Sequence, residues 1–263
     1  MSACNTRGDR ETARNCVVVG LPESTVRALK VRQSRIPWEI GQVPVKVVGA
    51  EPPDKGGKET GCKAVTISGI SFSQINLQLS KISSAFLAKS MASLHTGICL
   101  IQEPWLRGRI IKRLFRYPSR CKPRACILVK GCDAISMPSW CNQDLAIIKV
   151  ELPEENGAMS QVVVVSAYFP YDSRHPSPPA RVAELIAYCH KKGLPLLLGC
   201  DAISHNTVWR NTDTNARSEA LLQYQAPMYL MILNRGNDPT LTNAVWKKVI
   251  DLTFCSREVV QYL

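Results

Sequence analysis

Beyond residue 75 the chain shows two patterns of apolar and polar residues, one typical of strands and one typical of helices. The segment Gln161–Tyr168 contains four consecutive valines, and β-branched residues favour a strand over a helix. Shorter apolar runs, bounded by glycine, proline or charged residues, predict further strands. These runs are Ile98–Ile101, Ala125–Val129, Leu145–Val150, Pro195–Gly199, Met231–Leu233 and Val249–Phe254.

Three other segments place their apolar residues at helical spacing instead. They are Ser80–His95, Pro178–His190 and Asn215–Tyr224. Gly193 follows the second of these segments and predicts its end, because glycine readily adopts the backbone conformation that closes a helix. Short strands interspersed with helices indicate an α/β fold whose strands are covered on at least one face.

The beginning of the chain has no comparable periodicity. Residues 1–75 contain five prolines and a Gly/Lys-rich run, Asp54–Gly61, and both features are typical of turns and linkers. We therefore predict an irregular N-terminal extension over residues 1–73 and a folded domain over residues 74–263.

Composition narrows the class of protein. The 263 residues have a formal net charge of +12, and 45% of them are hydrophobic, which is too many for a wholly disordered chain. No apolar stretch approaches the roughly 20 residues of a membrane span, and the N-terminus lacks the apolar core of a secretory signal. The 11 cysteines are scattered without a CxxC pair, which argues against a disulfide framework or a zinc site. We expect an intracellular protein, nuclear or cytoplasmic, with no membrane partner and no small-molecule cofactor.

The positive charge is concentrated in one segment. Between Pro104 and Lys130 there is no acidic residue but nine basic ones, namely Arg107, Arg109, Lys112, Arg113, Arg116, Arg120, Lys122, Arg124 and Lys130. Such a cluster favours a nucleic acid as partner, bound through its phosphates with an affinity that falls as salt rises. The alternative is a solvated face that only keeps the protein soluble.

Three carboxylates lie in or directly after predicted strands. Glu103 follows one apolar run, Asp201 follows another and Asp251 lies within a third. Oxygen ligands that converge from strand ends suit a hard cation such as Mg²⁺, although any one of them is also an ordinary turn or helix-capping residue. Tyr168 ends the clearest strand, where a phenol either contacts a phosphate or simply packs. Together with the basic segment, these residues indicate metal-assisted phosphodiester chemistry.

Several short motifs occur in a recognisable order. They are NLQLSK at 76–81, QEPW at 102–105, SAYFP at 166–170, LLLGCDA at 196–202, SHNTVW at 204–209, DTNAR at 213–217, LNRGNDPT at 233–240 and VIDLTFCS at 249–256. In this order they resemble the apurinic-type endonuclease domain of non-LTR retrotransposons, a member of the endonuclease/exonuclease/phosphatase superfamily. The resemblance covers about residues 74–256. It implies a four-layer α/β sandwich, in which two facing sheets have helices outside and a metal site at one end.

The resemblance also implies roles for individual residues. Asn76 matches the asparagine that opens the active-site motif, and Glu103 matches the principal Mg²⁺ ligand. Tyr168 matches the tyrosine that contacts the scissile phosphate, and Asp201 matches the general base. Asp251 matches the carboxylate that holds a histidine near the C-terminus of the domain. His205 lies in a loop that the resemblance places near the nucleic acid, and we expect Arg107, Arg109, Lys112 and Arg113 to bind it as well.

The sequence departs from the family pattern at three places, of which the mildest is Gln78, where relatives outside the retrotransposons often have an acidic residue. Ile203 stands where many retrotransposon copies have an asparagine two positions after the aspartate, and an apolar side chain cannot donate a hydrogen bond. The closing Ser-Asp-His motif is expected beyond Phe254, but the sequence given ends at Leu263 without an Asp-His pair. Residues Leu21–Val45 are similar to the stretch that precedes the zinc knuckles of the gag-like protein, but the knuckle spacing itself is absent. These departures suggest a fused, C-terminally truncated copy.

These observations lead to one leading expectation and two alternatives. We expect a Mg²⁺-dependent DNA endonuclease that nicks a target site and is impaired by Ile203 and by the missing histidine. The first alternative is a non-catalytic nucleic-acid-binding remnant, and the second is a degenerate mobile-element product that does not fold stably. The sequence does not identify a protein partner.

Overall fold

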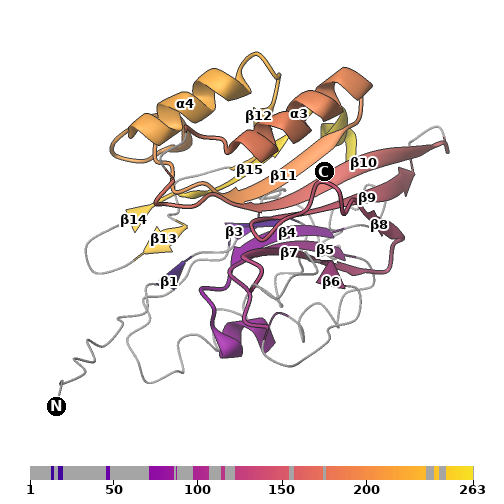
Figure 1. Cartoon of the computed structure of the whole chain (residues 1–263), viewed down its shortest axis with the longest axis horizontal. Coiled ribbons are helices and arrows are strands. Elements are labelled where there is room, and N and C mark those ends of the chain that lie inside the picture. Colours follow the sequence, from indigo (N-terminus) through magenta and orange to yellow (C-terminus); the bar gives the residue numbers. More distant parts are fainter. Residues whose placement is uncertain are drawn as a thin grey trace, which may run out of the picture.

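A computed structural model of the whole chain describes residues 71–85, 87, 97–106, 114–115, 122–153, 157–173, 176–234, 240–242 and 247–262, together with short strands at 13–14, 17–19 and 46–47. Within these residues, two six-stranded sheets face each other (Figure 1). One sheet has the order β3 (Lys46–Val47), β2 (Val17–Val19), β4 (Ser71–Asn76), β5 (Gly97–Gln102), β7 (Ala125–Lys130) and β6 (Leu114–Phe115). It is called the N-terminal sheet below.

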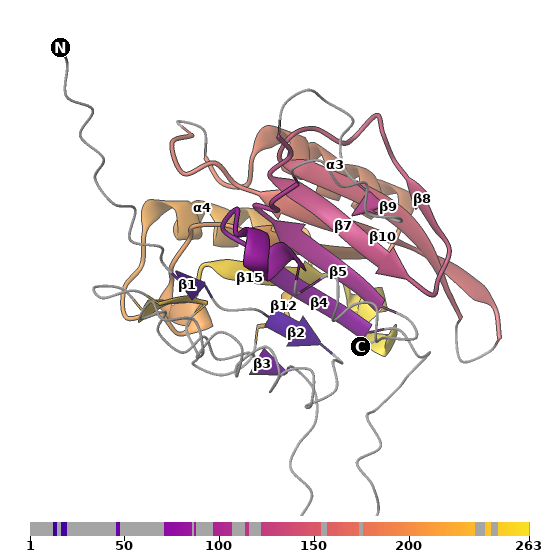
Figure 2. The same cartoon turned by 90° about the horizontal axis from the view of Figure 1, so that it is seen from below.

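The second sheet, called the C-terminal sheet, is built from later segments. Its order is β12 (Met231–Ile232), β15 (Asp251–Cys255), β11 (Leu196–Asp201), β10 (Met159–Tyr168), β9 (Leu145–Pro153) and β8 (Ala134–Ser136). A separate small sheet joins β1 (Ala13–Arg14), β13 (Leu241–Thr242) and β14 (Lys247–Lys248). Figure 2 shows the N-terminal sheet from below, in front of the C-terminal sheet.

Helices cover the outer face of the C-terminal sheet. Both α3 (Ala180–Lys192) and α4 (Ala216–Gln225) lie on that face (Figure 1). The helix α3 begins two residues later than the sequence predicted, because Pro179 is its N-cap with an extended ψ of 143°. Gly193 ends the helix as predicted, with a left-handed φ of 61° and its N–H directed at the carbonyls of the last turn. Two short 3₁₀ helices, η1 (Thr207–Trp209) and η2 (Arg257–Tyr262), complete this half of the fold.

A helical segment lies on the outer side of the N-terminal sheet. Residues 81–85 and 87 are helical, and Ser80 caps them by accepting a hydrogen bond from the Ser83 backbone N–H (3.2 Å). Leu87 lines a small apolar cavity together with Cys126 and Leu128 of β7. The order is therefore helix, sheet, sheet, helices, which gives four layers.

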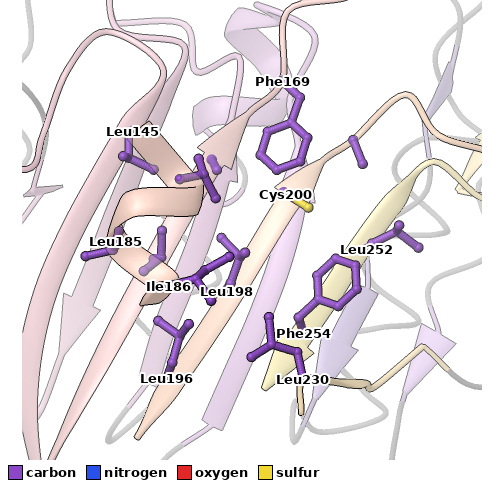
Figure 3. Packing of buried hydrophobic residues seen from close by; sticks show 14 of the residues in the cluster. Leu145, Phe169, Leu185, Ile186, Leu196, Leu198, Cys200, Leu230, Leu252 and Phe254 are labelled. Carbon is purple, nitrogen blue, oxygen red and sulfur yellow. The ribbon is translucent and has the colours of Figure 1, made fainter. Parts of the chain in front are cut away.

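The two-residue period of the strands explains which residues reach which layer. In β11, Leu196 and Leu198 pack against α3, whereas Leu197 faces the N-terminal sheet. Figure 3 shows the helix-facing cluster, where Leu185 and Ile186 of α3 meet the sheet. The second cluster lies between the sheets and includes residues of both, such as Phe72, Leu100, Val164 and Leu197. Both faces of the C-terminal sheet are therefore apolar, and this is why its strands are almost continuous apolar runs.

No helix within the described part of the chain has both the length and the apolar character needed to cross a bilayer.

Candidate active site

The ends of two parallel strand pairs meet at one end of the sandwich. In the N-terminal sheet β4 and β5 are parallel, and their last residues, Asn76 and Gln102, lie opposite each other. In the C-terminal sheet β10 and β11 are parallel, and their last residues, Tyr168 and Asp201, are partners. Parallel strands of equal register end at the same edge of a sheet, so each sheet brings two of these side chains to its edge.

Asp251 reaches the same edge from the opposite direction. It is the first residue of β15, which is antiparallel to β11, and its register partner is Asp201. Asn76, Asp201 and Asp251 are all buried, with 4%, 0% and 1% of their surface exposed. Buried carboxylates require polar partners or a cation, so these three residues form a polar cluster at one end of the interior.

A hydrogen bond joins the two sheets at this end. The Asn76 amide Nδ2 donates to Asp201 Oδ2 at 2.8 Å. The Asn76 Oδ1 accepts the backbone N–H of Gln78, also at 2.8 Å. Because the Asn76 amide oxygen already accepts a hydrogen bond within its own turn, the amide nitrogen points toward Asp201 in the other sheet. The sequence predicted both residues as site residues, and the structure brings them into contact.

Glu103 directly follows β5 and has an unusual backbone. Its φ is +47°, a left-handed conformation that is uncommon for residues other than glycine. Two hydrogen bonds hold it there, since its N–H donates to the Arg124 carbonyl and its own carbonyl accepts the Leu79 N–H, both at 2.8 Å. Strained backbone of this kind is often found at functional sites. Its side chain is half-buried.

Two residues that the sequence did not single out hold Asp251 in place. The Thr240 hydroxyl accepts the backbone N–H of both Ile250 (2.8 Å) and Asp251 (2.9 Å). The Asn234 side chain donates to the Asp251 carbonyl at 2.9 Å. Both residues lie in the motif LNRGNDPT at 233–240, so the motif identified the segment without indicating which of its side chains act.

Arg217 connects the two loops that follow Tyr168 and Asp201. Its guanidinium donates to the Pro170 carbonyl at 2.9 Å and to the Ala202 carbonyl at 3.3 Å. Burial lowers the pKa of Arg217, while the negative charge of Asp201 and the phenol of Tyr168 oppose that change. Its cation therefore lies close to both side chains. The sequence pattern that begins at Asn215 predicted α4 but did not predict that Arg217 bridges the two loops.

Uncharged polar side chains fill the space between the sheets next to the site. The Gln102 amide donates to the Ser166 hydroxyl at 3.0 Å and to the Gly199 carbonyl at 3.3 Å. Thr253 donates to the Gln74 amide oxygen at 2.7 Å. All of these side chains are buried. We call Gln74, Gln102, Ser166 and Thr253 the polar layer. The sequence pattern did not predict this layer, because an isolated glutamine or serine within a strand looks the same whether it is buried or exposed.

Ile203, which stands where the family pattern has an asparagine, has an unusual backbone conformation. This residue has a φ of +47°, and for a β-branched side chain such a conformation is a genuine outlier. Its carbonyl accepts a hydrogen bond from the Asn215 side chain at 3.3 Å. Asparagine adopts left-handed backbone much more readily than isoleucine. The backbone is therefore one that suits asparagine, whereas the side chain present is apolar.

His205 lies in the loop after β11 and contacts an acidic residue. Its Nδ1 is 3.1 Å from Asp213 Oδ2, and the Lys248 ammonium contacts the other oxygen of the same carboxylate. Burial and the positive charge of Lys248 lower the pKa of His205. The imidazole is therefore neutral near pH 7.

The four residues predicted to bind nucleic acid in the basic segment, Arg107, Arg109, Lys112 and Arg113, lie outside the described residues. Their role in binding stays a prediction. Of the basic residues nearby, Arg124 is described, and it lies beside Tyr168.

The donors at this end of the sandwich have the chemistry to hold a hard divalent cation. Among the described residues, no group of three or more His, Cys, Asp or Glu side chains is arranged to hold a metal ion. Mg²⁺ needs no such cage, because it is usually held by one or two carboxylates and completes its shell with water and substrate phosphates. The carboxylate of Glu103, next to the Asn76–Gln102 pair, is a donor of that kind.

Comparisons with known proteins agree with the fold and with the motifs. Residues 162–262 match the family model described as "Endonuclease-reverse transcriptase". The endonuclease domain of TRAS1, a telomere-specific non-LTR retrotransposon, is 27% identical; the alignment covers 72% of this chain and 86% of that domain, with a TM-score of 0.58. The catalytic domain of Xenopus laevis APE2 is 12% identical, with 73% and 83% covered and a TM-score of 0.52.

No curated protein matches the chain. The match to the family model and the similarity to the TRAS1 domain confirm the resemblance to retrotransposon endonuclease domains that the motifs indicated. The two solved structures also confirm the predicted α/β fold class.

Proposed function

We propose that this domain cleaves phosphodiester bonds in DNA with the help of Mg²⁺, and that it does so slowly. The observation that carries the proposal is the 2.8 Å hydrogen bond between Asn76 and Asp201. It brings together, at one end of the sandwich, two residues that the motifs matched to an active site. The similarity to the TRAS1 endonuclease domain supports a nuclease function and DNA as the substrate.

Each residue has a role that its chemistry allows. Asp201 accepts the proton of the attacking water, and the amide of Asn76 orients the carboxylate. Tyr168 donates a hydrogen bond to a phosphate oxygen. Glu103 would hold the cation, which supplies Lewis-acid polarisation of the phosphate. Arg217 adds a positive charge close to Asp201 and Tyr168, where negative charge on the phosphate grows during the reaction.

Ile203 explains why the reaction would be slow. An amide at this position could donate to the transition state, and the loss of one such donor costs on the order of 10²–10³ in rate. The left-handed backbone of Ile203 keeps the loop in the conformation that an asparagine would use. The defect would therefore lie mainly in the missing amide and not in the path of the backbone.

A plasmid-nicking assay tests the proposal. We expect nicking of supercoiled DNA with Mg²⁺, none with EDTA, and a loss of at least about 10²-fold for Glu103→Gln and Asp201→Asn. Glu184→Gln is the matched control, since this exposed glutamate pairs only with Arg181 of its own helix turn among the described contacts. Equal nicking by Glu103→Gln and the wild type would remove the metal role.

The apolar side chain at Ile203 also favours a second candidate, a domain that binds nucleic acid without cutting it. This candidate predicts DNA binding that weakens steeply with salt and survives Asp201→Asn. If the wild type binds DNA but neither it nor Ile203→Asn nicks the plasmid, the second candidate replaces the first.

A further inference from the structure

Arg124 is held by a carboxylate at the entrance to the candidate site. It lies just before β7, and its Nε and Nη2 donate to the two oxygens of Asp144 at 2.5 and 2.7 Å. Both side chains are only partly exposed, at 34% and 26%. A two-pronged contact between guanidinium and carboxylate has a defined geometry and is stronger than a single hydrogen bond. The Arg124 side chain is therefore restricted to one orientation.

That orientation places the cation over the ring of Tyr168. The guanidinium carbon lies 4.7 Å from the ring centroid, within the range of a cation–π contact. Asp144 also holds the backbone of the tyrosine, because its carbonyl accepts the Tyr168 N–H at 2.8 Å. One aspartate thus fixes both the strand end that carries Tyr168 and the arginine that covers its ring.

The backbone of Arg124 extends the connection to the other sheet. Its carbonyl accepts the N–H of Glu103 at 2.8 Å, one of the two hydrogen bonds that hold Glu103 in its left-handed conformation. Its own N–H donates to the Gln143 carbonyl at 2.7 Å, one residue before Asp144. Arg124 therefore contacts Glu103 of the N-terminal sheet through its backbone and Tyr168 of the C-terminal sheet through its side chain.

We propose that Arg124, clamped by Asp144, is a positioning residue that sets the placement of the Tyr168 phenol relative to Glu103. The proposal rests on the function proposed above. Two of the guanidinium nitrogens already donate to Asp144 and the cation lies over the ring of Tyr168, so in this proposal the action on the phosphate passes through Tyr168. The hydrogen bonds to Asp144 and its negative charge raise the pKa of Arg124, so the guanidinium keeps its positive charge.

A double-mutant cycle separates positioning through Tyr168 from direct contact with DNA. We expect Arg124→Gln to lower kcat for plasmid nicking about tenfold and to leave KM within about twofold, the size of one cation–π contact. In a Tyr168→Phe background, where the hydroxyl is gone, the same change should cost less than about twofold. Lys191→Gln removes an equal charge from an exposed side chain of α3, away from the basic segment, and should change neither constant.

Three results would overturn the proposal. Equal losses from Arg124→Gln in the wild type and in Tyr168→Phe would mean that Arg124 acts on the DNA by itself. A loss that appears mainly in KM would mean that it only binds substrate. A loss from Lys191→Gln as large as that from Arg124→Gln would mean that the effect comes from net charge alone. If Arg124→Gln does not fold, Arg124→Lys replaces it, because a lysine keeps the charge but lacks the planar two-pronged contact.

A second measurement does not depend on nicking. The seven tyrosines can be labelled with 3-fluorotyrosine, and Tyr168→Phe identifies the ¹⁹F signal of Tyr168. We expect Arg124→Gln to move that signal and Lys191→Gln to leave it in place. An unmoved signal overturns the proposal whatever the enzyme does. A wild type that fails to nick while the signal moves would remove the proposed function and keep the contact between Arg124 and Tyr168.

Discussion

The amide of Asn76 donates a hydrogen bond to Asp201 across 2.8 Å, although 125 residues separate them in the chain. Each residue ends a strand in a different sheet, so this one contact depends on how the two sheets are packed. The same two positions were singled out by the sequence motifs. Substitutions at this contact therefore test both the packing of the two sheets and the proposed chemistry.

Replacing Asn76 by alanine should affect stability and nicking together. Asp201 is fully buried, and a lost hydrogen bond to a buried charged group costs about 1.5–3 kcal/mol. We expect that loss in the free energy of unfolding, measured by denaturant titration, with nicking reduced by at least about tenfold. Thr212→Ala, which truncates a polar side chain at an exposed position, should change neither. Unaltered stability of Asn76→Ala would contradict the contact.

Replacing Ile203 by asparagine should raise activity. Asparagine accepts the φ of +47° found at this position with less strain than isoleucine, and its amide can donate to the transition state. We expect nicking to increase by about 10²–10³-fold. Ile203→Gly is the matched control, because it relieves the backbone without adding a donor. If glycine raises the rate as much as asparagine does, the strain and not the missing amide limits the enzyme.

Adding a methyl group at Gly199 should push the two sheets apart. A Cβ there would lie 2.6 Å from Leu100 Cδ1 and 2.8 Å from the amide oxygen of Gln74 in the polar layer. Overpacking of this kind typically costs about 1–3 kcal/mol. We expect Gly199→Ala to lower the free energy of unfolding by that amount, and by less in a Leu100→Ala background, where there is room. Strictly additive losses would show that the sheets do not meet at this point.

The stability of the protein should depend on pH through His205. Burial and the charge of Lys248 lower its pKa below the ordinary value of 6.5. As the pH falls below about 6.5, the unfolded chain takes up a proton that the folded protein does not, so stability is lost. Above that pH the imidazole is neutral in both states and contributes no slope. We expect the melting temperature to fall more in the wild type than in His205→Gln between pH 7 and 5.

NMR titration of the imidazole gives a direct check on the same cluster. Lys248→Met removes the nearby positive charge, and the pKa of His205 should rise toward or above its ordinary value because Asp213 then lacks its lysine partner. A pKa of His205 that is unaltered by Lys248→Met would leave burial as the whole cause. A parallel fall in melting temperature for the wild type and His205→Gln would show that other groups set the pH dependence.

Much of the fold could be read from local patterns. Four consecutive valines predicted β10, the helical spacing after Pro178 predicted α3, and Gly193 predicted its end. The motif order predicted the α/β class and the resemblance to retrotransposon endonucleases, and the comparisons confirmed both. Where the strand boundaries differed, the difference was small: Asp201 is the last residue of β11 and not a residue beyond it.

Only part of the candidate site could be predicted from the sequence. Asn76, Tyr168, Asp201 and Asp251 were proposed from motifs, and their roles remain predictions. Arg124 and Arg217 were passed over as site residues, because an arginine in a basic segment or in the first turn of a helix has the same local pattern whether it clamps a tyrosine or only meets solvent. Their partners, Asp144 and the carbonyls of Pro170 and Ala202, lie elsewhere along the chain.

The sequence by itself predicted β10, β11, α3 and α4, because their patterns depend on neighbours a few positions away. It did not predict β4 (Ser71–Asn76) or β8 (Ala134–Ser136). Only the tertiary structure decided that Gln74 meets Thr253 and that Asn76 meets Asp201. Such contacts join segments more than a hundred residues apart. They depend on strand register and on the approach of the sheets at Gly199, and both follow from the packing of the whole interior.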